Sequence, residues 1–506
     1  MRGAVSCRAA AVLACALLLV ACGRSGSAGA GAAPDPRATA VPAVIPNGDW
    51  TEFGYDPARG NVGPGNTGII AGDLGSLRRR IVHLDGTVDS SPIELHGVRV
   101  RGRTRDVIVV TTTYGRTIAL DAGSGARLWE YVPPSIGAVQ GSPQITTATP
   151  IFDPDRRYVY AASADGRIRK LVLATGREVR SAHWPARITF DATKEKLAAA
   201  LNTSGRYVIA TTGGYYGDAP PYQGHVAMID RSSGRVLHVF NTLCSDRHLL
   251  IVPSSCRYSD SAIFGRAGAV VERGTGRLLI ATGNGPFNGT TAWGDSVLEL
   301  SPDASRLLRT WTPADQASLE ASDTDTGSTS PGLLPLVGGR RLAVQGGKDG
   351  MLKLIDLDRL KGTASGAGGL GGELQRIPAP GSAQVFTAPA VWLNRGSVYV
   401  FVADDSGTAA YVLGGSGRPR LSVRWPHDTP GTSPVLAGGL LDVFDPSDGR
   451  LAIRDPASGR ALASLPAPTG HWNSPIVVGG RIILPGGNAN DHANSGELDI
   501  YHLPGR

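Results

Sequence analysis

Short apolar runs separated by turn residues fill most of the chain. Each run is four to seven residues long and rich in Val, Ile, Leu or Tyr, and many are followed by a turn signal such as Asp165-Gly166 or Asp448-Gly449. Runs of this length and composition predict β-strands. Eight such runs cover residues 106–111, 157–162, 206–212, 277–282, 341–345, 397–403, 440–444 and 481–484.

A second predicted strand follows each turn, so the pattern recurs about every 54 residues. Four-stranded units at this spacing are typical of a β-propeller. The sequence therefore predicts an all-β fold, a single eight-bladed β-propeller of four-stranded antiparallel blades over residues 48–506. We expect residues 77–84 to supply the outer strand of the last blade and so close the ring. The only stretch that reads as a helix is 193–201.

Composition supports this fold and limits the partners. Gly (68) and Pro (35) together make up about a fifth of the chain, a density that favours short strands and many turns. The net charge is +7, but the basic residues are almost all arginines spread along the chain, with no basic run interleaved with aromatic residues. We therefore expect no nucleic-acid partner.

The N-terminus carries an export signal. Residues 9–20 are apolar, too short to span a bilayer, and follow Arg2 and Arg8. The segment ends Leu19-Val20-Ala21-Cys22, which resembles the bacterial lipobox. We expect a lipoprotein signal peptide over 1–21, and a lipidated Cys22 with a flexible tether over 22–47. The protein would then be an exported, extracytoplasmic cell-membrane lipoprotein that contacts the membrane through its lipid anchor; an ordinary secretory signal is the alternative.

Two cysteines remain in the predicted exported domain, Cys244 and Cys256. In an oxidising compartment such a pair predicts a disulfide. Closing a loop of this size is worth about 3 kcal/mol in the chain-entropy description. The alternative is a metal pair, for which only His248 lies nearby as a further ligand.

One repeat carries a recognisable motif. Residues Ala119 to Trp129 read A-L-D-A-G-S-G-A-R-L-W, which resembles the tryptophan-docking repeat of the PQQ-binding-like, or quinoprotein alcohol dehydrogenase-like, β-propellers. Three later copies carry Arg180, His238 and Arg309 in place of the tryptophan, so the motif is degenerate there. The resemblance covers residues 48–503 and implies the same propeller fold.

The resemblance also implies a site for pyrroloquinoline quinone (PQQ) and Ca²⁺. Asn284, in Thr282-Gly-Asn-Gly, matches the segment that supplies a calcium ligand, and Asp218 is the nearest match to a second one. Phe264 stands where the family has an aromatic floor under the quinone. Lys348 matches the lysine that contacts the quinone. Each residue also has an ordinary explanation, as a turn residue or a core aromatic.

Two acidic residues match the position of the family's catalytic base, Asp323 first and Asp325 second. In this family the base takes the proton of an alcohol while the quinone accepts electrons. A solvated acidic turn is the alternative explanation.

Several family features are missing. There is no adjacent Cys-Cys pair, no first calcium glutamate and no C-x-x-C-H haem motif. The sequence therefore favours a non-catalytic binding or scaffold module of the cell envelope, monomeric, with a protein or carbohydrate ligand. The alternative is a PQQ- and calcium-dependent dehydrogenase of alcohols or sugars at the outer face of the cell membrane; no motif points to a hydrolase.

Overall fold

The computed structural model describes residues 48–336, 338–362, 369–415 and 417–505. All of them belong to one compact unit. The predicted signal peptide (1–21), Cys22 and the tether (22–47) lie outside the described residues. In the described part, no helix is long and apolar enough to cross a membrane.

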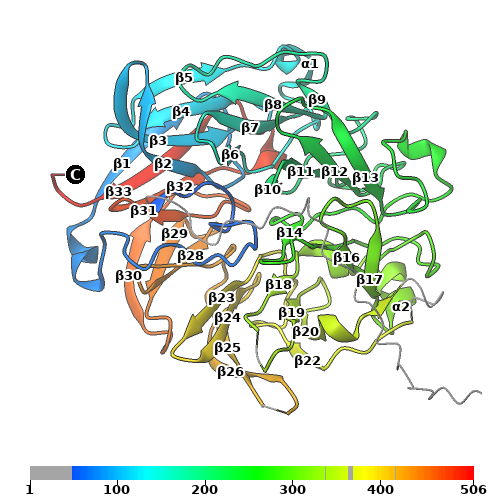
Figure 1. The fold of residues 1–506 in the computed structure, drawn as a ribbon. Helices are drawn as coiled ribbons and strands as arrows, with labels where there is room; N and C mark the ends of the chain where they lie inside the picture. The colour runs from blue at the N-terminus through cyan, green and yellow to red at the C-terminus, as the bar shows by residue number, and fades with distance from the viewer. Residues whose placement is uncertain (1–47, 337, 363–368, 416, 506) are drawn as a thin grey trace, which may run out of the picture. The chain divides into compact units, whose positions relative to one another are not determined.

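Eight antiparallel sheets form the eight blades of a ring (Figure 1), which confirms the predicted fold class. Blades 1 to 4 consist of β2 (Ile93–Val100), β3 (Arg103–Thr111), β4 (Thr117–Asp121) and β5 (Arg127–Tyr131); β6 (Ile151–Phe152), β7 (Tyr158–Ser163), β8 (Arg167–Val172) and β9 (Ala186–Arg187); β10 (Asn202–Ser204), β11 (Tyr207–Thr211), β12 (His225–Asp230) and β13 (Val236–Asn241); and β14 (Val270–Val271), β15 (Leu278–Ala281), β16 (Val297–Leu300) and β17 (Leu307–Trp311).

The second half of the ring repeats the plan. Blades 5 to 8 consist of β18 (Gly332–Leu333), β19 (Leu342–Gln345), β20 (Met351–Asp356) and β22 (Gln375–Pro378); β23 (Ala390–Asn394), β24 (Ser397–Ala403), β25 (Thr408–Gly414) and β26 (Arg420–His427); β27 (Val435–Ala437), β28 (Leu440–Asp445), β29 (Arg450–Arg454) and β30 (Ala461–Pro466); and β31 (Ile476–Val478), β32 (Arg481–Gly486), β33 (Gly496–His502) and β1 (Arg78–Leu84). A short strand, β21 (Lys361–Gly362), adds to blade 4.

Burial explains why the sequence reveals the middle strands best. The second and third strands of a blade are covered on both faces by neighbouring blades, so strands such as β15 and β28 are buried along their whole length and are mostly apolar. The eight predicted runs are the second strands of the eight blades. First strands of successive blades touch one another, as β23 touches β27 and β27 touches β31, and they line the ring axis.

The ring closes as predicted. β1 pairs antiparallel with β33, from Arg78 opposite His502 to Leu84 opposite Gly496. The first strand of the described chain is therefore the outer strand of the last blade. Because both ends of the propeller share one sheet, opening the ring requires breaking a complete strand pair.

Tryptophan docking survives in more blades than the motif indicates. Trp129 donates from Nε1 to the carbonyl oxygen of Leu173 at 2.7 Å, and its ring lies where a side chain on Gly176 would stand. Trp184 and Trp425 cover Gly234 and Gly459 of the next blades in the same way. The glycines are needed because any Cβ there would meet the indole ring.

The predicted helix at 193–201 is wrong. Lys196, within this stretch, forms an isolated bridge with Gly213, and the segment from Leu197 to Leu201 is buried without helical hydrogen bonds. The α-helices of the described chain are short and lie in connections: α1 (Ile136–Val139) and α2 (Gln316–Ala321). The 3₁₀ segments are η2 (Ala71–Ser76), η3 (Pro253–Ser255), η4 (Thr326–Ser328), η5 (Leu357–Arg359) and η7 (Ala489–Asp491).

The predicted disulfide between Cys244 and Cys256 is present, with Cα atoms 6.2 Å apart. It closes a loop within the connection between β13 and β14. The alternative of a metal pair at these cysteines is therefore excluded.

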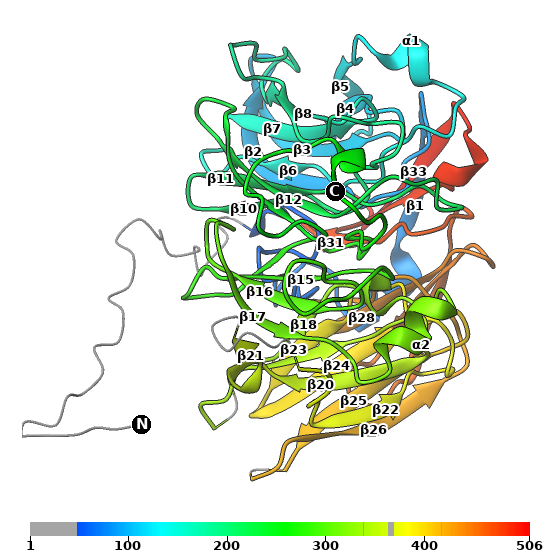
Figure 2. The same cartoon turned by 90° about the vertical axis from the view of Figure 1, so that its right-hand side faces the viewer.

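The alternating strand directions give the ring two different faces. Turns between second and third strands, and the connections between blades, meet on one face, which we call the cavity face; α1 and α2 lie there, on one side of the ring in Figure 2. The remaining hairpin turns point to the opposite side, which we call the strap face.

A strap of extended chain, residues 48–67, crosses the strap face (Figure 1, blue). It hydrogen-bonds to first strands or their hairpins around the ring: Trp50 to Glu94 in blade 1, Gly60 to Val391 in blade 6, and Thr67 to Gly480 in blade 8. The strap thus ties distant blades together at the ring axis.

Candidate functional site

A cavity of about 680 Å³ lies on the cavity face. Its size falls in the range of about 300–1,000 Å³ typical of cofactor and small-molecule sites. All six residues that the sequence assigned to cofactor, metal or catalysis line it: Asp218, Phe264, Asn284, Asp323, Asp325 and Lys348.

The repeat brings these residues together. Asn284 and Lys348 follow the second strands of blades 4 and 5 at equivalent turns, and Asp218 lies in the corresponding loop of blade 3. Phe264 and the two aspartates lie in the connections into blades 4 and 5. All these segments end on the same face of the ring. The blade to which a turn belongs therefore determines where its residues lie around the cavity.

Lys348 joins the two candidate bases. Its Nζ lies 3.2 Å from Oδ1 of Asp323 and forms a shorter ion pair with Oδ2 of Asp325. Its backbone N–H also donates to the carbonyl oxygen of Asp325 at 2.8 Å. Burial alone would lower the pKa of Lys348, but the attraction of Asp325 and Asp323 outweighs it and raises that pKa.

The two aspartates differ in their surroundings. Asp325 is 2% exposed and accepts a hydrogen bond from the backbone N–H of Asn284, whereas the side chain of Asp323 is 60% exposed. Burial raises the pKa of Asp325, and Lys348 offsets only part of that rise. Gly283 permits this packing, because a Cβ there would lie 2.6 Å from Oδ1 of Asp325.

Further carboxyl groups surround this pair, and the sequence analysis missed them. Asp295 is completely buried; burial raises its pKa to about 8, and its Oδ1 accepts from the backbone N–H of Thr326 at 2.9 Å. Glu320, on α2, accepts from the N–H of Gly285, and burial raises its pKa. No local motif marks either residue, because their proximity depends on how blades 4 and 5 pack.

The opposite wall is cationic and was also missed. Lys196 and Arg266 line the cavity, and burial lowers the pKa of Lys196 to about 8. Arg266 lies 3.8 Å from the buried carboxylate of Asp89, which accepts from His471 at 2.8 Å. Burial would raise the pKa of Asp89, but His471 and Arg266 together hold it near 2.

Aromatic side chains form the remaining walls. Phe386 and Trp472 pack with ring centroids 4.9 Å apart, and Phe264 meets the edge of Tyr222 at 6.5 Å. The hydroxyl of Tyr222 donates to Asp218 at 2.6 Å. The cavity therefore offers flat apolar surfaces between an acidic wall and a cationic wall.

A metal site is less well developed. Among the described residues there is no group of three or more His, Cys, Asp or Glu side chains arranged to hold a metal ion. Asp218 is engaged by Tyr222, and Lys348 already supplies the positive charge between Asp323 and Asp325. The metal-binding roles of Asn284 and Asp218 remain predictions.

Comparison with known proteins defines the fold type. The family described as outer membrane protein assembly factor BamB matches residues 84–278. The quinohemoprotein alcohol dehydrogenase ADH IIB of Pseudomonas putida is 24% identical over 452 residues, covering 77% of this chain and 61% of that protein. The chain thus spans less than two thirds of the length of this curated relative.

Solved structures agree. The quinohemoprotein alcohol dehydrogenase of Comamonas testosteroni superposes with a TM-score of 0.66 at 16% identity, covering 91% of this chain and 81% of that one. The fold is that of the quinoprotein alcohol dehydrogenase-like β-propellers. A europium-containing methanol dehydrogenase gives a TM-score of 0.65 at 14% identity, with 90% and 98% covered. The resemblance read from the quinoprotein-type repeat is confirmed at the level of fold.

Proposed function

We propose that this quinoprotein-like propeller is a PQQ-dependent dehydrogenase that oxidises the hydroxyl group of an alcohol or a sugar in the cavity. One observation carries the proposal: six residues selected from separate motifs line a single cavity. This reverses the preference of the sequence for a non-catalytic module, since a scaffold does not require these side chains to converge.

The chemistry of the walls fits the cofactor. PQQ is a flat aromatic tricarboxylate, and the cavity combines aromatic side chains with the cations Lys196, Arg266 and Lys348. When bound, the quinone supplies a two-electron acceptor. The residues fit the quinone better than calcium, so we assign no step to a metal.

Asp325 is the residue best placed to take the proton of the substrate hydroxyl. A general base works best when its pKa lies close to the working pH, and burial moves the pKa of Asp325 in that direction. Lys348 holds the Asp325 carboxylate in place through its ion pair. Asp323 is more exposed and is the weaker candidate.

The first test is calorimetric titration of the chain from Ala38 onward with PQQ, alone and with Ca²⁺ or Eu³⁺. We expect one-to-one binding at micromolar concentration or tighter. The quinone-loaded protein is then screened with alcohols and sugars using an artificial electron acceptor, because these 506 residues contain no C-x-x-C-H motif.

Matched variants test the base. Asp325→Asn should keep quinone binding and lower kcat by about 10²–10⁴-fold, while Asp323→Asn should change kcat only a few-fold. Absence of quinone binding, or full activity in Asp325→Asn, would overturn the assignment. Quinone binding without turnover of any alcohol or sugar would support the cofactor site but contradict the proposed dehydrogenase activity.

We also propose export and lipid attachment at Cys22, supported by the apolar segment 9–20 and the lipobox-like sequence before the cysteine. Labelled palmitate should be incorporated into the protein in a bacterial host and should be absent from the Cys22→Ser variant. Equal labelling of the two forms would rule out this anchor.

A further inference from the structure

Exposed arginines recur at the hairpin turns of the strap face. Two of them, Arg101 and Arg395, follow the first strands of blades 1 and 6. Four more follow third strands: Arg177, Arg235, Arg306 and Arg460. None of these six forms an ion pair within the described part of the chain.

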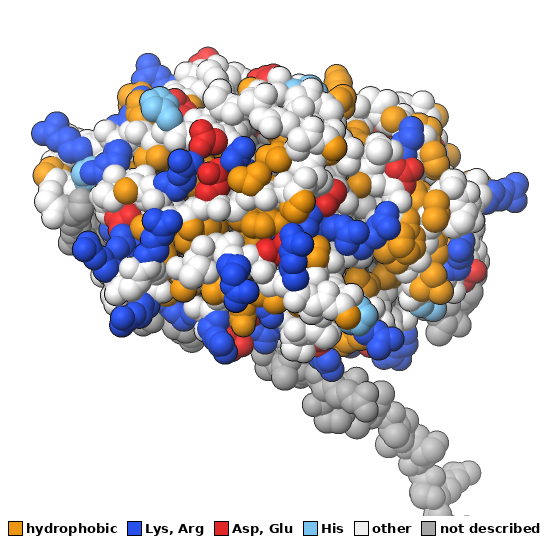
Figure 3. All heavy atoms as spheres, turned by 90° about the horizontal axis from the view of Figure 1, so that it is seen from above, with side chains coloured by type: hydrophobic (Ala, Val, Ile, Leu, Met, Phe, Trp, Pro, Cys, Tyr) orange, Lys and Arg blue, Asp and Glu red, His pale blue; other side chains and the backbone are white. Residues whose placement is uncertain are grey.

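These four arginines occupy one structural position. Each closes its turn by accepting a hydrogen bond at its carbonyl oxygen from the N–H of the residue that ends or follows the third strand, as Arg177 accepts from Val172 and Arg460 from Asp455, both at 2.9 Å. The repeat therefore places a guanidinium at the same place on blades 2, 3, 4 and 7. Figure 3 shows the ring from its edge, with the strap face at the bottom. On this edge, Lys and Arg side chains lie mostly in the lower half.

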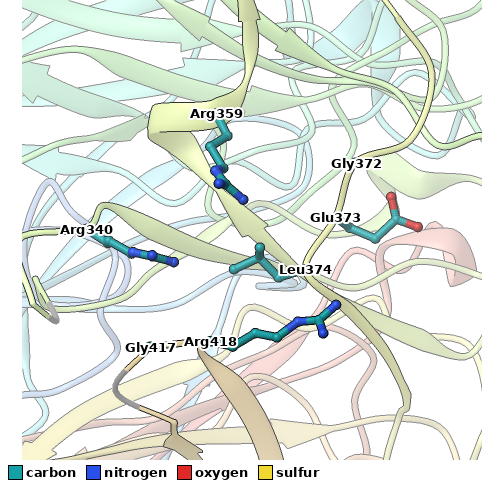
Figure 4. A pocket seen from close by; sticks show the side chains of 7 residues that line it. All are labelled: Arg340, Arg359, Gly372, Glu373, Leu374, Gly417 and Arg418. Carbon is teal, nitrogen blue, oxygen red and sulfur yellow. The ribbon is translucent and has the colours of Figure 1, made fainter.

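Three more arginines surround a hollow of about 450 Å³ between blades 5 and 6. Arg340, Arg359 and Arg418 point into it around Leu374 (Figure 4). Arg340 and Arg418 lie in hairpin turns on the strap-face side, and Arg359 ends η5, directly after the third strand of blade 5. Three guanidinium groups around one hollow are suited to an oxyanion such as a phosphate group.

Nearby acids neutralise this charge only partly. Glu373, which also lines the hollow, is engaged by Arg376 at 2.7 Å and by Trp311 at 3.2 Å. Asp356 lies 4.0 Å from both Arg340 and Arg359, but its side chain is buried. The hollow therefore presents net positive charge to an approaching ligand.

Apolar side chains extend from the same face. Leu336 and Leu393, in the first hairpins of blades 5 and 6, are 70% and 56% exposed. Exposed leucines beside arginines are typical of surfaces that insert apolar groups among lipid headgroups while the cations bind phosphates.

The strap lies on the same face. Its residues Asp49 and Trp50 are held there by Arg156 and Glu94. The cavity opens on the opposite face.

From these features we infer that the strap face docks on an anionic phospholipid surface, with a headgroup phosphate in the hollow formed by Arg340, Arg359 and Arg418. Docking leaves the cavity open to solvent. The inference does not depend on the proposed quinone chemistry, because no residue of the cavity takes part.

The test uses residues 38–506, which contain every strand of the ring and its closing pair. This chain, which lacks Cys22, is sedimented with phosphatidylcholine vesicles that do or do not contain phosphatidylglycerol, at low and high salt. We expect binding only to vesicles with phosphatidylglycerol, weakened by salt. An arginine at an anionic surface contributes about fivefold to binding.

The triple variant Arg340→Gln, Arg359→Gln, Arg418→Gln should lose at least tenfold in vesicle binding. The matched control, Arg257→Gln, Arg424→Gln, Arg450→Gln, removes the same charge from exposed positions away from the hollow and should bind like the parent. Equal losses in the two variants, no preference for phosphatidylglycerol, or binding of inorganic phosphate without binding of vesicles would overturn the inference.

Discussion

Asp442 carries a buried carboxyl group with an unpaired oxygen atom. It lies on β28 inside blade 7, fully buried, and its Oδ2 has no hydrogen-bond partner among the described residues. Burial raises its pKa from an ordinary value near 4 to about 8. The folded protein therefore favours the neutral acid. The stability gained from that proton is fully present below about pH 4, the ordinary pKa, and is lost progressively as the pH rises from about 4 to 8.

The Asp442→Asn variant should remove this dependence. We expect stability equal to the parent near pH 4 and greater by about 1–3 kcal/mol at pH 9, where the parent carries a buried charge. Thermal unfolding followed at both pH values measures the difference. Asp428→Asn, at a fully exposed side chain, is the control and should behave like the parent at both. A constant difference across the pH range would contradict the assigned pKa.

Lys348 controls the acidity of Asp325 in the cavity. In Lys348→Met the ammonium group is gone, so burial raises the pKa of Asp325 further, opposed only by the hydrogen bond from the N–H of Asn284. The acid limb of the kcat/KM profile should then shift to higher pH, because the base loses its proton later. Lys196→Met removes a cavity lysine on the other wall and should leave the limb in place. An unshifted limb in Lys348→Met would exclude Asp325 as the titrating base.

At the site, the sequence identified residues that follow recognisable turns and missed those defined by packing between blades. Asn284 and Lys348 could be located because Thr-Gly-Asn-Gly and Lys-Asp-Gly turns have fixed places in a blade. Lys196, Arg266 and Asp295 have no such marker, and their roles depend on side chains from other blades. Local motifs therefore identify the site residues that this chain shares with the quinoprotein-type repeat. They do not identify the side chains that packing between blades brings to the site.

Among the elements, β1 has the most demanding position because it closes the ring. Its burial alternates: Leu84 belongs to the core around blades 7, 8 and 1, whereas Ile81 is 45% exposed. The Leu84→Ala variant should lower the free energy of unfolding by about 2–4 kcal/mol. Ile81→Ala, in the same strand, should cost well under 1 kcal/mol.

Denaturant unfolding of the two variants measures this contrast. Similar small losses would mean that the strand contributes little to closure. The sequence allowed β1 to be assigned correctly because a propeller requires a partner for its last blade. It gave no sign of two-residue inner strands such as β6 or β14, since so short a segment has no periodicity to detect.

For the whole molecule, the cavity matters because the loops that line it come from blades on different sides of the ring. A ligand bound there contacts several blades at once and stabilises the folded ring as a unit. At a PQQ concentration 100 times its Kd, the expected stabilisation is about 2.7 kcal/mol. Calorimetric unfolding should show one transition moved to higher temperature, and no shift would contradict a site of this kind.

The pairing of β1 with β33 also means that the ring can close only after the whole propeller has been synthesised. The two strands lie more than 400 residues apart in the chain, so during synthesis the first has no partner until the last has emerged. For that interval β1 is an open strand edge, the kind of segment that recruits other chains into aggregates. It begins Arg78-Arg79-Arg80, and three adjacent positive charges repel a second copy in the same register. The arginines at the start of the closing strand thus protect the unfinished ring from joining its neighbours.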